Sequence, residues 1–70
     1  MSHQISSAKM LFESIELVNK FFKSDIKKLQ LWFDTQNPNF GDVSPMWLIQ
    51  NGRLHKVHQF IMDSIEGNSP

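Results

Sequence analysis

The sequence predicts an all-α fold, a compact bundle of about four short helices over residues 6–22, 25–35, 45–51 and 54–66. Apolar residues recur at helical spacing along the longer segments. Ser, Asp, Pro and Gly stand where the segments would begin and end. No segment alternates polar and apolar residues as a half-buried strand does. We therefore expect residues 1–70 to form one helical domain with an ordered loop between the second and third helices.

Two apolar stripes run along the first predicted helix, residues 6–22. One stripe consists of Ala8, Leu11, Ile15, Val18 and Phe22, and the other of Met10, Leu17 and Phe21. The helix either packs on two sides within the domain or meets another chain along one stripe. Four short helices do not easily cover so wide an apolar arc. We therefore predict a homodimer that uses Met10, Leu17 and Phe21, with burial of this stripe inside a monomer as the alternative.

The second helix and the loop after it are predicted from local signals. Ser24 and Asp25 are expected to provide a cap and an N-terminal negative charge for this helix. The expected buried face is Ile26, Leu29, Trp32 and Phe33. Asn37-Pro38 ends this segment, because proline disfavours helical geometry in the residue before it. Gly41 then permits a positive φ, and Asp42 can hydrogen-bond nearby backbone.

The third and fourth helices are bounded by similar signals. Ser44 is the expected N-cap of the third helix, Pro45 its first residue and Gly52 its C-cap. The fourth helix has a buried stripe of Leu54, Val57, Ile61 and Ile65 and is ended by Gly67. We expect the loop to be held by a core that places together Trp32, Phe40, Trp47 and Leu48 with Leu11, Ile15, Ile61 and Ile65.

The residue types argue against several kinds of function. The chain has no cysteine, so disulfides and thiolate metal sites are excluded. His55 and His58 have a spacing that can serve a metal, but two histidines on a helix surface are the simpler explanation. No nucleophile with a base and an orienting group, and no glycine-rich phosphate loop, is present. We expect no catalytic, cofactor or metal site, and hence a protein that is not an enzyme.

Charge and hydropathy limit the kinds of partner and the cellular location that we expect. Seven basic and seven acidic residues cancel, which argues against direct DNA binding. The third helix offers Met46, Trp47, Leu48 and Ile49 rather than side chains that read bases. No stretch approaches the roughly 20 apolar residues that span a bilayer, and the N-terminus lacks the regions of a signal peptide. A cytoplasmic protein is therefore expected.

An ordered set of landmarks over residues 21–67 resembles the toxin-binding domain of the MbcA/ParS/Xre antitoxin family. The set comprises Phe21-Phe22, Trp32-Phe33, the loop from Asn37-Pro38 through Gly41, the turn Ser44-Pro45-Met46-Trp47-Leu48-Ile49, Gly52, Val57 and Ile65-Glu66-Gly67. The family mostly has Leu at Phe33 and Phe40, Ala at Leu29 and a second Gly at Asp42. Many members also carry an N-terminal helix-turn-helix, for which the roughly 20 residues before the match leave no room.

The resemblance implies a non-catalytic antitoxin that binds and neutralises a toxin, a RES-domain enzyme that consumes NAD. Such antitoxins cover the entrance to the toxin's active site, with the C-terminal segment prominent in the contact. The expected contact residues lie around the last helix and the tail: Arg53, Lys56, Phe60, Glu66, Asn68 and Ser69. Two alternatives remain open. One is a small DNA-associated transcriptional regulator whose Lys27, Lys28, Arg53 and Lys56 form one patch, and the other is a homo-oligomeric helical scaffold.

Overall fold

The structure of the chain is a computed structural model that describes residues 6–67, and the side chains of residues 6–65. Its elements, in chain order, are α1 (Ser7–Phe21), α2 (Ile26–Asp34), the 3₁₀ turn η1 (Pro38–Phe40), α3 (Pro45–Gln50) and α4 (Leu54–Gly67). The predicted all-α class is confirmed. The ends differ from the prediction by one residue or so, because the capping residues flank the helices. Gly67, predicted to follow the last helix, is its final residue.

Three helices begin at side-chain N-caps, and the cap at Ser44 was predicted. Ser6 and Asp25, predicted as the first residues of their helices, are the N-caps of the other two. The Ser6 hydroxyl accepts a hydrogen bond from Lys9 N, and the Ser44 hydroxyl accepts one from Trp47 N. The Asp25 carboxylate accepts one from Lys28 N. Each side chain satisfies a backbone donor that has no partner within its helix.

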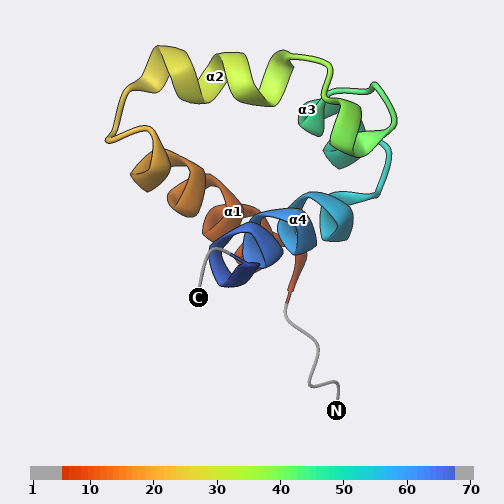
Figure 1. The fold of residues 1–70 in the computed structure, drawn as a ribbon. Coiled ribbons are helices and arrows are strands. Elements are labelled where there is room, and N and C mark those ends of the chain that lie inside the picture. Colours follow the sequence, from red (N-terminus) through yellow and green to blue (C-terminus); the bar gives the residue numbers. More distant parts are fainter. Residues whose placement is uncertain (1–5, 68–70) are drawn as a thin grey trace.

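The helices form a ring of packed pairs (Figure 1). α1 crosses α4, α4 packs against α3, and α3 packs against α2, which lies across from the crossing of α1 and α4. Short connections set this order: residues 22–25 join α1 to α2, and residues 51–53 join α3 to α4. None of the helices in residues 6–67 is both long enough and apolar enough to cross a bilayer.

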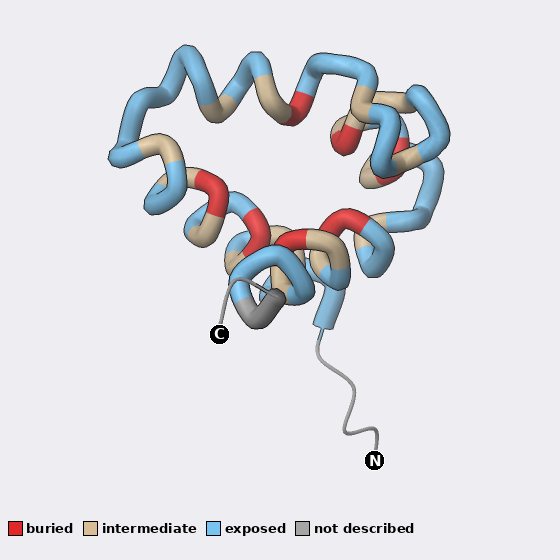
Figure 2. The backbone as a smooth tube through the Cα atoms, viewed as in Figure 1, coloured by how far each residue is buried: buried red, intermediate tan, exposed pale blue. Residues whose placement is uncertain are grey.

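Every helix contributes to one small core. The buried apolar side chains are Val18, Phe33, Leu48, Val57 and Ile61. They lie on the inward sides of their helices (Figure 2). Ser14 is also fully buried, and its hydroxyl donates to Met10 O within the same helix at 2.8 Å.

Part of the predicted core is wrong. Leu48 and Ile61 are buried, and Trp32 and Phe40 pack against the core as expected. Trp47, however, is 43% exposed, because the six-residue α3 turns Pro45 and Leu48 inward and Trp47 lies to one side.

On α1 the observed buried face is rotated from the predicted one. On α2 and α4 the predicted core residues that are exposed lie near the helix ends. The buried face of α1 is centred on Ser14 and Val18, so Ile15 is turned outward and is 37% exposed. Ile65 is 49% exposed because it borders an open groove near the end of α4. Ile26, predicted to lie on the buried face, is also exposed at the first turn of α2.

The predicted ordered loop is closed by backbone bonds around Asn37. Asn37 N donates to Val43 O, while Asn37 O accepts from the backbone amides of Phe40 and Asp42. The Asn37 side chain accepts from Asn39 N at 2.9 Å. Gly41 has a φ of 74°, as the sequence predicts, and Asp42 follows it at 64°. The loop therefore holds Phe40 in one place beside the core.

Candidate functional site

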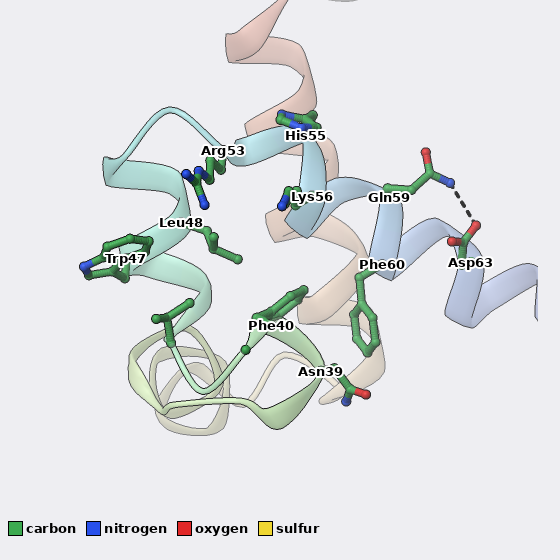
Figure 3. Close-up of a pocket in the computed structure, with 12 residues that line it drawn as sticks. Asn39, Phe40, Trp47, Leu48, Arg53, His55, Lys56, Gln59, Phe60 and Asp63 are labelled. Carbon is green, nitrogen blue, oxygen red and sulfur yellow. Dashed lines mark hydrogen bonds between the residues drawn. The ribbon is translucent and has the colours of Figure 1, made fainter.

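The candidate binding surface is a groove between η1, α3 and the N-terminal half of α4 (Figure 3). Its volume is about 830 Å³, enough to receive several side chains of a partner, and it is open to solvent. The lining residues are Asn39, Phe40, Gly41, Val43, Trp47, Leu48, Arg53, His55, Lys56, Gln59, Phe60 and Asp63. We call it the α3–α4 groove.

Aromatic side chains form the floor of the α3–α4 groove. The Phe40 and Phe60 rings meet edge to face with centroids 5.0 Å apart. Phe40 also lies edge to face with Trp32 at 6.3 Å, and Trp32 with the buried Phe33 at 5.0 Å. Such contacts add to the stabilisation from burial alone. The apolar floor is therefore fixed to the domain core.

Basic side chains stand at one end of this floor. Arg53 directly precedes α4, and His55 and Lys56 lie in its first turn; all three are exposed. Figure 3 shows Arg53 and Lys56 on the side of α4 that faces α3. At the other end Gln59 Nε2 donates to Asp63 Oδ1 at 2.8 Å. The groove thus has a basic end and an acidic end.

The basic residues at this end of the groove are unfavourable for the stability of α4 itself. The first turn of α4 contains no acidic residue. A helix N-terminus has a partial positive charge, so cations there destabilise the helix by roughly 0.3–1 kcal/mol each and anions stabilise it. Local folding energetics therefore do not explain why Lys56 stands where glutamate is favoured.

The structure brings together half of the predicted toxin-contact residues. Arg53, Lys56 and Phe60 all line the α3–α4 groove. Glu66 lies on the last turn of α4, but its side chain is outside the described residues, as are Asn68 and Ser69 entirely. Trp47 and Phe40 also line the α3–α4 groove, although the sequence predicted both to lie in the core. Adjacent residues on a helix point about 100° apart, so Trp47 and Leu48 were not both to be expected at the centre of the buried face.

A second groove lies between the C-terminal halves of α1 and α4, and we call it the α1–α4 groove. It is lined almost entirely by apolar side chains, and its volume is about 260 Å³. Two of the predicted self-association residues, Leu17 and Phe21, border it, together with Ile61 and Ile65. The third, Met10, is half-buried and does not line it. Phe21 is 78% exposed, so the predicted surplus of apolar surface is real.

The two helical histidines have different surroundings. His58 Nε2 lies 2.5 Å from Glu13 Oε1, which joins α4 to α1 by a partly buried ion pair. His55 is exposed at the α3–α4 groove. Within residues 6–67 no three His, Asp or Glu side chains are grouped so that they could hold a metal ion.

The basic residues of the DNA-associated alternative do not converge within one chain. Lys27 and Lys28 lie at the start of α2, whereas Arg53 and Lys56 lie at the start of α4. Figure 1 shows these two helix ends on opposite sides of the molecule. A single basic patch would need residues from more than one chain.

Comparisons with protein-family models, curated proteins and solved structures gave no match. The resemblance to the antitoxin family therefore stays a prediction that rests on the motif residues quoted above. The geometry of the α3–α4 groove stands independently of it.

Proposed function

We propose that this chain is a non-catalytic, antitoxin-like cytoplasmic protein that binds and neutralises a partner protein through the α3–α4 groove. One observation supports this most: exposed cations and a rigid aromatic floor share one groove. Arginine and aromatic residues are the residue types enriched where protein interfaces gain most of their affinity. Arg53 can pair with a carboxylate through two hydrogen bonds, and Phe60 offers apolar area that a partner would cover.

The proposed partner is a RES-type toxin, as the family resemblance implies. Contacts at Arg53 and at Glu66 would place the two ends of α4 in one interface. This helix has 14 residues, or about 21 Å of length at 1.5 Å per residue. A stable interface buries about 800 Å² on each partner, which is compatible with such a span.

Co-expression with a RES-type toxin, sought first in the genes next to the one that encodes this chain, tests this proposal. We expect the full chain to restore growth, and the double variant Arg53→Glu with Lys56→Glu to restore it poorly. The matched control is Lys27→Glu with Lys28→Glu, which makes the same charge change on α2 and is expected to rescue fully. A chain ending at Ile65 tests the tail and is expected to rescue poorly although folded. Absence of rescue by the full chain would contradict the antitoxin function.

Self-association is the second candidate activity, and the α1–α4 groove favours it. The exposed Phe21 ring stands beside a groove of apolar side chains on the same face. In a two-fold dimer each Phe21 can enter the other chain's groove, because a two-fold interface pairs one patch with itself. Sedimentation at micromolar concentration is expected to show a dimer that Phe21→Glu dissociates. Phe12→Glu is the control, since Phe12 is 69% exposed on the same helix but does not line the groove. A monomeric parent protein would contradict the dimer.

A further inference from the structure

We infer that the partner segment which enters the α3–α4 groove is an acidic stretch of protein chain with one large apolar side chain, Phe or Leu for example. This inference rests on the proposed protein-binding function and adds the chemistry of the segment that is bound. It is carried by the charges at the groove's basic end, by their position on α4, and by the distance from them to the aromatic floor.

In the part of the chain that the structure describes, no side chain at the basic end of the groove carries a carboxylate. Among the described side chains the ion pair between His58 and Glu13 is the only one, so Arg53 and Lys56 have no such partner there. Both are exposed and border the groove. A partner carboxylate placed between them would also approach the positive N-terminal end of α4. Two independent sources of positive potential thus favour an acidic group at this end.

The aromatic floor lies one helical turn further along the same face. Lys56 and Phe60 are four residues apart on α4, so their side chains are neighbours on the helix surface. One turn is about 5.4 Å, which an extended chain spans in roughly two residues at about 3.3 Å each. The bound segment is therefore expected to place its acidic residues within about two residues of its apolar one.

The acidic end of the groove fixes the direction of the bound segment. Asp63, held by Gln59, would repel a carboxylate placed there. An acidic segment therefore fits with its carboxylates toward Arg53 and its apolar side chain toward Phe40 and Phe60, and the reverse orientation is disfavoured.

A nucleic acid is the competing anionic ligand, and the groove suits it less well. Bases bind by stacking on exposed aromatic faces. Phe40 and Phe60 are half-buried and packed edge to face, which leaves little open ring face. The lining residues include one carboxylate, and the whole chain has no net positive charge.

Fluorescence anisotropy of labelled octapeptides tests the inference directly. The probe has two consecutive glutamates, one glycine and then a single phenylalanine, with glycines elsewhere. Its binding to the full chain is expected to weaken about tenfold or more when glutamine replaces glutamate or alanine replaces phenylalanine. A peptide with lysines in place of the glutamates is expected not to bind. Equal binding of the lysine peptide, no binding of the probe at millimolar concentration, or tighter binding of an eight-nucleotide oligothymidylate would overturn the inference.

Charge reversal on the protein separates binding from folding. Lys56→Glu is expected to abolish binding of the glutamate probe without lowering the melting temperature, because an acid is favoured at this helix position. Arg53→Glu with Lys56→Glu is expected to transfer the preference to the lysine peptide, while Lys28→Glu leaves both peptides unaffected. Unchanged probe binding by Lys56→Glu would place the acidic segment elsewhere.

Growth rescue distinguishes this failure from failure of the proposed function. If the charge-reversed chain still rescues cells from the toxin and the probe does not bind, the chemistry inferred for the groove is wrong and the antitoxin function stands. If the parent chain does not rescue cells while the probe binds selectively, the antitoxin function is wrong and the chemistry inferred for the groove stands.

Discussion

The two grooves of this domain are built on opposite halves of the same helix, yet they differ in chemistry. The N-terminal half of α4 supplies cations and an aromatic floor to the α3–α4 groove. Its C-terminal half supplies apolar side chains to the α1–α4 groove. Phe60 lines both. A charged groove selects a partner by its charge, whereas an apolar groove beside an exposed Phe21 is suited to a copy of itself.

The largest expected effect on stability comes from Leu48, which anchors α3 as one wall of the α3–α4 groove. Leu48 is 3% exposed, whereas its neighbour Trp47 is 43% exposed. We expect Leu48→Ala to lower the free energy of unfolding by about 2–5 kcal/mol. Trp47→Ala, the matched control, is expected to cost less, about 1–2.5 kcal/mol, because 43% of Trp47 remains exposed. Urea unfolding measures both, and an equal loss in the two variants would mean that Trp47 belongs to the core.

The next effect concerns Phe60, the side chain common to the two grooves. Replacing it with alanine removes a half-buried ring and its edge-to-face contact with Phe40, so we expect a loss of about 1.5–3 kcal/mol. Phe60→Leu keeps most of the apolar area and is expected to lose about 0.5–1.5 kcal/mol. A double-mutant cycle with Phe40→Leu isolates the ring contact. If the two losses simply add, the rings do not stabilise each other and the floor is not fixed by this pair.

The sequence predicted local features more accurately than the residues that face the core. The cap at Ser44 and the positive φ at Gly41 were predicted because each depends on neighbours within a few residues. The face of α1 was misplaced because its centre is Ser14, a polar residue that no hydropathy pattern assigns to a core.

In the candidate site, too, features that depend on nearby residues were predicted better than contacts between distant segments. Arg53, Lys56 and Phe60 were predicted together as contact residues around the last helix, because they are close in the sequence. The contact between Phe40 and Phe60 was not predicted, because it depends on how η1 and α4 meet in space. Trp47 was misassigned because a helix as short as α3 shows no apolar periodicity.

A smaller effect is expected from the ion pair that joins α1 to α4 near their crossing. Glu13 and His58 have side chains that are 37% and 17% exposed. Partly exposed pairs contribute roughly 0.2–1 kcal/mol, and salt screens them. A double-mutant cycle with Glu13→Gln and His58→Gln is expected to give a coupling in this range that falls as sodium chloride is raised. A coupling near zero at low salt would show that apolar packing alone joins the two helices.

The smallest effects on stability are expected at the positive-φ residues of the loops beside the α3–α4 groove. Asp42 has a φ of 64°, a conformation that glycine adopts without steric cost. Asp42→Gly is therefore expected to raise the free energy of unfolding by about 0.3–1 kcal/mol. Gly52→Ala is the converse: no atom obstructs an added Cβ, but φ is 75°, so a loss of about 1 kcal/mol is expected. Thermal unfolding compares the two, and a destabilised Asp42→Gly would show that the Asp42 side chain stabilises the loop.

The comparison of the two grooves is tested most directly by mapping chemical shifts in isotope-labelled protein titrated with the glutamate–phenylalanine octapeptide. We predict that backbone shifts concentrate at Phe40, Arg53, Lys56 and Phe60 and that the signals of Phe21 and Ile65 do not move. Shifts centred on Phe21 and Ile65 would contradict this account, because they would place the peptide in the α1–α4 groove and make apolar area, not charge, the basis of partner binding.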